Sequence, residues 1–242
     1  MSLIINIISE ITAWDDRTLI WLNQFMFRWP LFDSSVEWLL YANIIKFLPM
    51  ILAVCWLWFE RTAHQAHNRK ILVESILTTL SALFFARVFA LTLPFRDRPF
   101  IRPDLHFLTP VVPDMRTWSS FPSDHAVMAF ALAASLFRIS PRIGLWACFH
   151  ATVFICFPRL YFGLHHPSDL IGGGLIGIAM VLVTSHLHAR HAVTGYLLSI
   201  ESKHPAMFYT FGFFVLYEMS EMFITFRLLA NYIFHGLRHV FT

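Results

Sequence analysis

Long runs of apolar residues alternate with short polar stretches along most of the chain. A helical run of about 20 apolar residues is long enough to cross the hydrocarbon core of a bilayer. Runs of about this length predict five or six membrane-spanning helices in an all-α bundle. We expect these helices near residues 38–59, 71–95, 122–138, 143–160, 168–188 and 207–234.

The first 36 residues carry a different pattern. Large apolar residues recur at roughly helical spacing in residues 3–29, but charged residues interrupt them. This pattern predicts an amphipathic helix that lies at the membrane interface and ends at Pro30. Its first ten residues lack the basic start of a secretory signal, so we expect no cleavage. The interrupting residues are Glu10, Asp15, Asp16, Arg17 and Arg28, and Trp14, Trp21 and Trp29 suit the headgroup level.

The composition supports an integral membrane protein. Of the 242 residues, 57% are hydrophobic and only 14% are charged, and the mean hydropathy is +0.60. These values exclude an ordinary soluble domain. The formal net charge of +3 comes with arginines at the ends of apolar runs rather than in a stripe, so we expect no nucleic-acid partner. The three cysteines form no C-x-x-C pair and are expected to be buried thiols.

Basic residues predict the orientation of the bundle. The loops 60–70, 138–142 and 189–206 carry them and fall on one side, which the positive-inside rule makes cytoplasmic. The segments 96–121 and 159–169 then share the external face. No internal repeat or linker divides the chain, so we expect one domain. It comprises an amphipathic N-terminal segment at 1–36, a catalytic bundle at 38–188 and an additional span at 207–234, within residues 1–242.

The first candidate group on the external face is a pair of arginines, Arg96 and Arg98, held by the proline that follows them. Guanidinium groups match phosphate oxygens bidentately, so the pair indicates a phosphate site. Arginines that flank membrane helices also extend to the headgroup level without any ligand. Taken alone, the pair does not separate these two interpretations.

The second group opens the third run with the sequence Ser-Ser-Phe-Pro-Ser-Asp-His at residues 119–125. Serine and proline are helix-start signals, and a helix N-terminus offers unpaired N–H groups to an anion. His125, in the first turn, can donate a proton to a leaving oxygen or take one from water. An ordinary helix cap beside an interfacial histidine is the alternative interpretation.

The third group joins the fourth and fifth runs. Arg159 precedes His165 by six residues, and Asp169 follows His165 by four. This set supplies a phosphate clamp, a nucleophile or base, and an orienting carboxylate. With the other two groups it forms a set suited to phosphoryl transfer, in which arginines stabilise charge. We expect no metal, because the available carboxylates, Asp97, Asp124 and Asp169, form no metal-ligand cluster.

These three groups resemble the motifs of the type 2 phosphatidic acid phosphatases (PAP2), which share a fold with vanadium haloperoxidases. Arg98 and the next proline match the end of the first motif, residues 122–125 match the second, and Arg159, His165 and Asp169 match the third. The resemblance implies a membrane lipid phosphatase without a cofactor. It implies that His165 attacks phosphorus, Asp169 orients it, His125 protonates the leaving group, and Arg98, Arg159 and Ser123 bind phosphoryl oxygens.

The chain departs from this family at three motif positions. Leu91 stands where the first motif has a lysine, Asp124 replaces a glycine, and Pro158 replaces a serine. Arg96 is the nearest residue that can supply the missing cation, and Arg87, on the same helical face as the motif arginine, is another candidate. The Ser-Asp-His and Arg-Pro-Phe sequences are similar to those of bacterial undecaprenyl-diphosphate phosphatases, which favours an isoprenoid diphosphate as substrate.

Charged residues in the sixth run form a weaker signal, because charges inside a membrane are costly and mark a functional site by default. A structural pairing within the bundle, for instance with Arg87, is the alternative. Three histidines near the end of the fifth run have a spacing that metals use, but no carboxylate or cysteine accompanies them, so we expect no metal there. The two sets are Glu218, Glu221 and Arg227, and His186, His188 and His191.

Two other functions stay compatible with the sequence. A phosphotransferase would form the same phosphohistidine and pass the group to a second lipid or sugar. A transporter or a non-catalytic membrane scaffold would instead depend on the charged sixth run. The lipid is also open among undecaprenyl diphosphate, phosphatidic acid, phosphatidylglycerol phosphate and lipid A. We expect a lipid phosphate and membrane lipids as partners, and the sequence does not give the oligomeric state.

Overall fold

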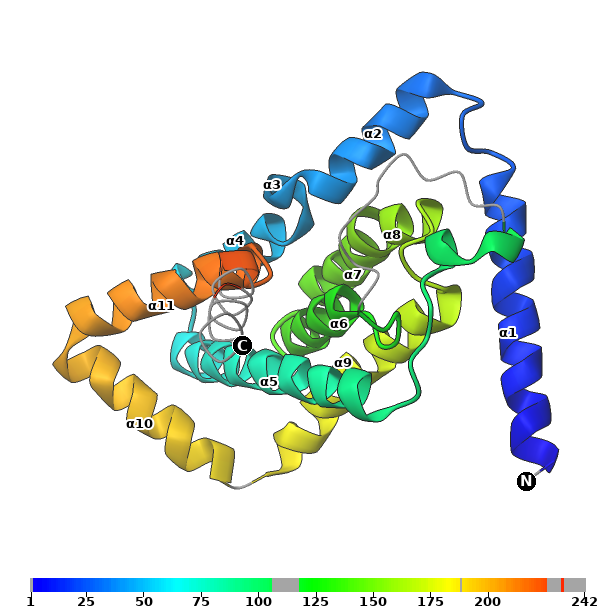
Figure 1. The fold of residues 1–242 in the computed structure, drawn as a ribbon. Helices are drawn as coiled ribbons and strands as arrows, with labels where there is room; N and C mark the ends of the chain where they lie inside the picture. Colours follow the sequence, from blue (N-terminus) through cyan, green and yellow to red (C-terminus); the bar gives the residue numbers. More distant parts are fainter. Residues whose placement is uncertain (1, 106–117, 188, 226–231, 233–242) are drawn as a thin grey trace.

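The computed structural model describes residues 2–105, 118–187, 189–225 and 232. Every regular element within these ranges is a helix (Figure 1). The elements are α1 (Ser2–Asn23), α2 (Pro30–Tyr41), α3 (Asn43–Lys46), α4 (Leu48–Phe59), α5 (Gln65–Thr92), the 3-10 turns η1 (Pro99–Ile101) and η2 (Pro103–Leu105), α6 (Asp124–Phe137), α7 (Pro141–His150), the π-helical turn η3 (Ala151–Cys156), α8 (Phe157–Tyr161), α9 (Pro167–His186), α10 (Ala189–Lys203) and α11 (Pro205–Ser220).

Helices α5 to α9 form the centre of the molecule, and the remaining helices frame it (Figure 1). Helix α6 packs against α5, α7 and α9, and α1 packs along one side against α8 and α9. On the opposite side α10 and α11 form a V that meets α4 and α5. The central position of α6 explains its composition, because its small side chains, Ala126, Ala129, Ala131 and Ala133, are fully buried.

Glycines in α9 bring this helix unusually close to α6. A Cβ atom at Gly177 would lie 2.3 Å from the carbonyl oxygen of Val127, and one at Gly173 would lie 2.7 Å from that of Ser123. Contacts this short exclude any side chain at either position, and small residues are what permits close approach of membrane helices. The close packing fixes the N-terminus of α9 beside that of α6.

Within the described residues, three helical segments are long and apolar enough to cross a membrane: Gln65–Thr92, Pro141–Tyr161 and Pro167–His186. Two shorter apolar helices, Leu48–Phe59 and Asp124–Phe137, accompany them. These five segments correspond to the expected second to fifth spans and to the second half of the first. The chain is therefore an all-helical integral membrane protein.

Two expected elements differ from the structure. The expected span 38–59 is not one helix: the backbone is extended at Ala42, where α2 ends, and α4 starts again beside Pro49. Proline has no N–H group for a continuing helix, which accounts for the second break. Residues 189–206, expected as a loop, are mostly helix α10.

The two ends of the chain only partly correspond to their expected elements. Helix α11 covers the first part of the expected span 207–234 and ends at Ser220, whereas Arg227 lies outside the described residues. Helix α1 occupies the position of the expected amphipathic helix, and its location at a membrane interface stays a prediction. One of its charged residues, Asp15, is fully buried against the bundle rather than on a polar surface.

Candidate functional site

The N-terminal ends of α6 and α9 meet the segment that follows α5, and the expected site residues gather there. His125 lies in the first turn of α6, Arg159 in α8, and His165 directly before α9. The described contacts join the second motif to the third, because the backbone N–H of Ser123 donates to the carbonyl oxygen of Asp169 at 3.3 Å. Five of the six core motif residues are almost fully buried: Arg98, Ser123, Arg159, His165 and Asp169.

A tight turn between α8 and α9 sets the relative positions of the third-motif residues. Gly163 has φ of 62°, a left-handed conformation that glycine adopts without strain. The backbone N–H of Leu164 then donates to the carbonyl of Arg159 at 2.9 Å, which closes the turn. The N–H of Phe100 donates to the carbonyl of Gly163 at 3.0 Å and so ties the first motif to the third.

The imidazole of His165 has a defined tautomer. Its Nδ1 lies 2.9 Å from the carbonyl oxygen of Ser120 and 3.7 Å from Oδ2 of Asp169. Both neighbours are hydrogen-bond acceptors, so Nδ1 carries the proton and Nε2 keeps a free lone pair. Nε2 lies 3.4 Å from a terminal nitrogen of Arg98, so the lone pair faces the guanidinium.

The surroundings of His165 keep this imidazole neutral. Burial is the largest influence and lowers the pKa of His165 below its ordinary value of 6.5. Asp169 acts in the opposite direction, while the positive charges of Arg98 and Arg159 lower the pKa further. The ring is therefore unprotonated at neutral pH, as a nucleophilic imidazole must be.

The carboxylate of Asp169 is fully buried and held from several directions. Its Oδ2 accepts from the hydroxyl of Ser120 at 2.5 Å and from the backbone N–H of His166 at 2.8 Å. Its Oδ1 accepts from Arg96 at 2.5 Å. Charge-assisted bonds of this kind keep the group ionised and fixed in place, as an orienting carboxylate requires. His166, which had no expected role, also turns its Nδ1 toward Asp169 at 3.2 Å.

Arg96 is enclosed by carboxylates of the protein itself. One terminal nitrogen donates to Asp169 and to Ser168 Oγ, at 2.5 and 2.8 Å, and the other donates to Asp15 at 2.6 Å. Asp15 in turn accepts from the backbone N–H and the hydroxyl of Ser168, at 2.9 and 2.5 Å. The structure thus places Arg96 behind Asp169, where its charge already has two partners.

Arg98 and Ser123, unlike Arg96, each have a buried polar atom without a hydrogen-bond partner among the described residues. One terminal nitrogen of Arg98 donates to the carbonyl of Leu164 at 2.8 Å, but its Nε has no hydrogen-bond partner among the described residues. The same holds for the buried hydroxyl of Ser123. Burial lowers the pKa of Arg98 to about 10, with Asp124 and Asp169 opposing it, so the group stays charged at neutral pH. Buried polar atoms are normally satisfied, so these two groups are candidate donors to a bound anion, and the guanidinium of Arg98 also lies beside His165 Nε2.

Arg159 reaches the same region from a distorted stretch of helix. It follows the π-helical turn η3, and its terminal nitrogen donates to the carbonyl of Ile155 at 2.6 Å. Pro158, which stands at the serine position of the motif, has no N–H group and therefore suits a helix whose regular bonding has already widened. Turns of this type occur often at functional sites.

Arg87 and Asp124 pair with each other. The guanidinium of Arg87 donates to Oδ2 of Asp124 and lies over the ring of Trp118, 4.5 Å from its centroid. The departure from glycine at Asp124 is thus matched by an arginine on α5. Leu91, which stands at the lysine position of the first motif, is 78% exposed and is therefore not buried with the other motif residues.

Sequence reasoning missed three contributors to this region. Asp15 was assigned to the polar side of an interfacial helix, and Ser120 was read only as part of a helix start. Lys46 was overlooked inside the expected span 38–59, although an ionisable residue in a membrane run is a functional signal by itself. It is 6% exposed, and the ring of the next residue, Phe47, lies 5.9 Å from that of His125.

The remaining weak signals do not join the site. Among the described residues, no three histidine, cysteine or acidic side chains converge as metal ligands, while His188 and the side chain of His191 lie outside the description. Glu221 accepts a hydrogen bond from the amide of Asn43, and Glu218 is buried in α11. Arg87, the suggested partner for these glutamates, pairs elsewhere.

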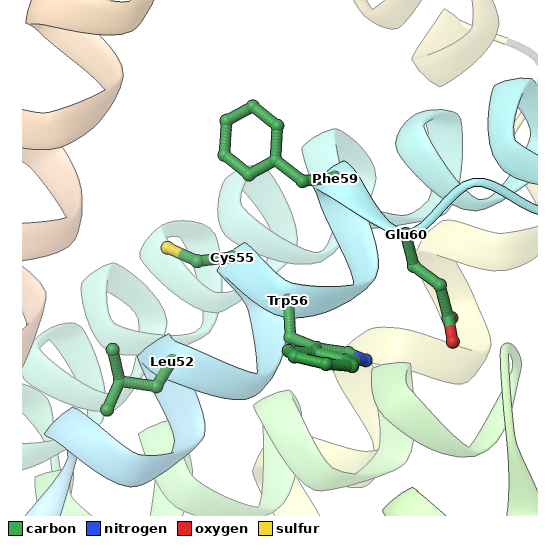
Figure 2. A pocket seen from close by; sticks show the side chains of 5 residues that line it. All are labelled: Leu52, Cys55, Trp56, Phe59 and Glu60. Carbon is green, nitrogen blue, oxygen red and sulfur yellow. The ribbon is translucent and has the colours of Figure 1, made fainter.

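A separate pocket lies on α4, and Figure 2 shows that its lining side chains all come from that helix and its C-terminal end. Four of the five are apolar or weakly polar, and Glu60 is the single charged one. The lining includes no cation and none of the motif residues. Its lining consists of Leu52, Cys55, Trp56, Phe59 and Glu60.

Comparison with known proteins gives a consistent result. Residues 71–192 match the PAP2 superfamily, a range that contains all three motifs but neither Asp15 nor Lys46. Undecaprenyl-diphosphatase BcrC of Bacillus subtilis (strain 168) is 28% identical over 146 residues, which cover 60% of this chain and 69% of that protein. Putative undecaprenyl-diphosphatase YbjG of Escherichia coli (strain K12) is 31% identical over 140 residues, covering 56% and 64%.

A third relative and a solved structure extend the comparison. Lipid A 4'-phosphatase of Bacteroides thetaiotaomicron is 35% identical over 118 residues, which cover 40% of this chain and 50% of that protein. The matched regions thus span from half to about two thirds of the relatives' lengths. The crystal structure of a transmembrane PAP2-type phosphatidylglycerolphosphate phosphatase from Bacillus subtilis aligns with a TM-score of 0.51 at 19% identity, covering 73% of this chain and 85% of that one. This similarity shows the fold.

Proposed function

The chain belongs to the PAP2 superfamily of membrane phosphatases, and we propose that it removes phosphate from a lipid diphosphate through a phosphohistidine intermediate. The observation that carries the proposal is the pairing of a nucleophile with a vacant anion site. The lone pair of His165 Nε2 faces Arg98, whose buried Nε, like the hydroxyl of Ser123, has no partner in the described structure. A phosphoryl group bound by these donors would present phosphorus to Nε2.

In the first step, Nε2 of His165 attacks phosphorus and the bond from phosphorus to the leaving oxygen breaks. His125 donates a proton to that oxygen. The imidazole acquires a positive charge, which Asp169 stabilises through the Nδ1 side of the ring. Arg98, Arg159 and the N-terminus of α6 stabilise the negative charge on the transferred phosphoryl group.

In the second step, water gives a proton to His125 and attacks phosphorus. The bond between phosphorus and His165 Nε2 then breaks, which releases inorganic phosphate and restores the neutral imidazole. Atoms and charges balance over the two steps, and no redox partner is needed. In this assignment Arg96 acts on the reaction only through Asp169, which it holds together with Asp15.

We favour undecaprenyl diphosphate as the substrate. Two relatives are named undecaprenyl-diphosphatase or its putative equivalent, and each aligns with more than half of this chain. Another relative is named for lipid A and a structural neighbour for phosphatidylglycerolphosphate, so these lipids and phosphatidic acid are the competing substrates.

The proposed location is the external face of the cytoplasmic membrane. Basic residues in the loops 60–70, 138–142 and 189–206 support this orientation through the positive-inside rule. The motif residues lie at the opposite ends of α5, α6 and α9 from these loops. The proposal includes one bundle domain with five or six spans and an interfacial α1.

Replacement of the nucleophile tests the proposal directly. We expect the purified protein in detergent to release phosphate from undecaprenyl diphosphate, and H165A to lose about a thousandfold or more of kcat, as removal of a covalent nucleophile does. E218Q is the control, because Glu218 lies in α11 outside the motifs. H165A with unchanged activity would exclude the phosphohistidine mechanism, and sensitivity to E218Q alone would favour a transporter or scaffold.

Product analysis separates hydrolysis from transfer. Incubation with undecaprenyl diphosphate and a lipid or sugar alcohol should yield inorganic phosphate and no phosphorylated acceptor. Activity should persist in EDTA and fall with vanadate, an analogue of the transferred group. A panel of the four competing lipids then ranks the substrates by kcat/KM.

A further inference from the structure

Lys46 is a buried cation held close to the site by its own backbone. It is the last residue of α3, and its carbonyl oxygen accepts a hydrogen bond from Nε2 of His150 at 2.8 Å. The ring of the next residue, Phe47, lies 5.9 Å from the imidazole of His125. Contacts of α3 with η3, and of Phe47 with the first turn of α6, therefore fix the position of the Lys46 backbone.

The ammonium group of Lys46 has no direct ion-pair partner among the described residues. Its side chain is 6% exposed, and its ammonium group forms no hydrogen bond or ion pair with any described residue. The charged groups that act on it are Arg159, which is also a cation, and Glu221, whose carboxylate accepts from the amide of Asn43. Two neighbouring buried cations repel each other, and Glu221 forms no salt bridge with either of them in the described structure, so the arrangement is suited to an anionic ligand.

The side of the site on which Lys46 lies indicates what it would bind. His125 is the residue that protonates the leaving oxygen in the proposed mechanism, and Phe47 packs against His125. Lys46 precedes Phe47 in the chain, so its backbone lies on the same side of the site as His125. When a lipid monophosphate reacts, the leaving group is an alcohol. When a lipid diphosphate reacts, the leaving group is itself a phosphate and carries additional negative charge.

We propose that Lys46 binds the lipid-attached phosphate of a diphosphate substrate and thereby favours diphosphates over monophosphates. The proposal rests on the proposed phosphatase function and deepens it. Lys46 also supplies a cation from α3 in a chain that has exposed Leu91 at the lysine position of the first motif. The side chain holds the leaving phosphate in place and stabilises its charge as the bond to phosphorus breaks.

The test compares K46M with K46R on farnesyl diphosphate and farnesyl monophosphate. We expect K46M to lower kcat/KM for the diphosphate about 10- to 100-fold, the value of one charged hydrogen bond, and to change the monophosphate less than about threefold. K46R keeps the charge and should retain most of the preference. Equal losses on both substrates, or no loss on the diphosphate, would refute the proposal.

A competing role is neutralisation of Glu221, and the double variant K46M/E221Q separates the two. If Lys46 only balances this carboxylate, E221Q restores the stability and the activity that K46M removes, which overturns the proposal. If Lys46 binds the leaving phosphate, E221Q restores neither the diphosphate activity nor the preference. Thermal unfolding in detergent gives the stability of each variant.

A measurement on the wild-type protein tests the proposal even if the K46M variant does not fold. The pKa of Lys46 is lowered to about 8, first by burial and then by Arg159, while Glu221 opposes them. The ammonium therefore loses its proton as the pH rises through 8, and KM for the diphosphate should rise several-fold between about pH 7 and 9. Arg98 and Arg159 keep their charge in this range, and a constant KM would contradict the proposal.

Failure of the proposed function leaves a distinct signature. A wild-type protein that hydrolyses none of the lipid phosphates refutes the phosphatase assignment. Stabilisation by inorganic diphosphate in a thermal unfolding assay still reports on the anion site in that case. We expect stabilisation of the wild type and of H165A but not of K46M, and equal stabilisation of all three would exclude Lys46 from the site.

Discussion

Two pairs of arginines near the site differ in what holds them. Arg96 and Arg87 are engaged by carboxylates of the protein: Arg96 by Asp15 and Asp169, and Arg87 by Asp124. Arg98 and Arg159 each donate to one backbone carbonyl instead, Arg98 also lies against His165 Nε2, and no described carboxylate pairs with either arginine. The difference teaches that a basic residue near a phosphate site is not automatically a phosphate ligand, because its charge is available only where the protein has not already neutralised it.

The largest effect should follow from loss of an available arginine. We expect R98A to lower kcat/KM at least about a thousandfold, because it removes a cation that faces both the nucleophile and the transferred group. R98K keeps the charge but loses the planar fork, and should cost about 10- to 100-fold. Rates of phosphate release measure both variants.

Unfolding temperatures in detergent accompany these rates, because Arg98 also donates to the carbonyl of Leu164. A fully active R98A would remove the distinction between the two pairs of arginines. So would an R98A variant whose loss of activity merely followed loss of folded protein.

A smaller effect should follow from loss of Arg96, which acts through Asp169. We expect R96Q to lower kcat about 10- to 100-fold with little change in KM, since a displaced carboxylate misaligns the nucleophile without removing a phosphate contact. The pH profile supplies a second readout. Activity requires neutral His165, so it is lost as the pH falls through a pKa that burial holds below 6.5. Removal of a neighbouring positive charge raises that pKa, so the acid limb of R96Q should move to higher pH.

A double-mutant cycle with D15N tests whether α1 acts through Arg96. Asp15 contacts Arg96 and Ser168 but not the phosphate donors, so D15N should cost about 10-fold or less and should add little to R96Q. Fully additive losses would show that the two residues act separately. A rise in KM rather than a fall in kcat for R96Q would instead make Arg96 a phosphate ligand, as its position in the sequence suggested.

The sequence was informative where spacing is local. His165 and Asp169 are four residues apart at a helix start, which brings them together whatever the rest of the chain does. Apolar run length likewise located α5, α6 and α9 to within a few residues at most of their ends, apart from the N-terminus of α5. Both signals depend only on residues that are neighbours along the chain.

The choice of ion-pair partner could not be obtained in this way. Asp15 reaches Arg96 across 81 positions and Lys46 reaches the site from α3, and no periodicity encodes such contacts. Helix α10 was missed because its mixed composition resembles a polar loop. The breaks in the expected first span arise from backbone conformation at Ala42 and from Pro49, which a count of apolar residues does not register.

The smallest effect should come from the pair formed by Arg87 and Asp124. We expect R87A alone to cost about three- to tenfold, because it removes the positive charge that pairs with Asp124 in the first turn of α6, next to the proposed anion site. Removal of both charges in R87A/D124G should restore activity to within about threefold of the wild type, since glycine occupies this position in the motif that residues 122–125 resemble. A double variant less active than R87A would show that Asp124 itself contributes to phosphate transfer. We would measure kcat/KM of R87A, R87A/D124G and R98A on one diphosphate substrate. The comparison decides whether an arginine that a carboxylate already neutralises contributes less to catalysis than one without such a partner.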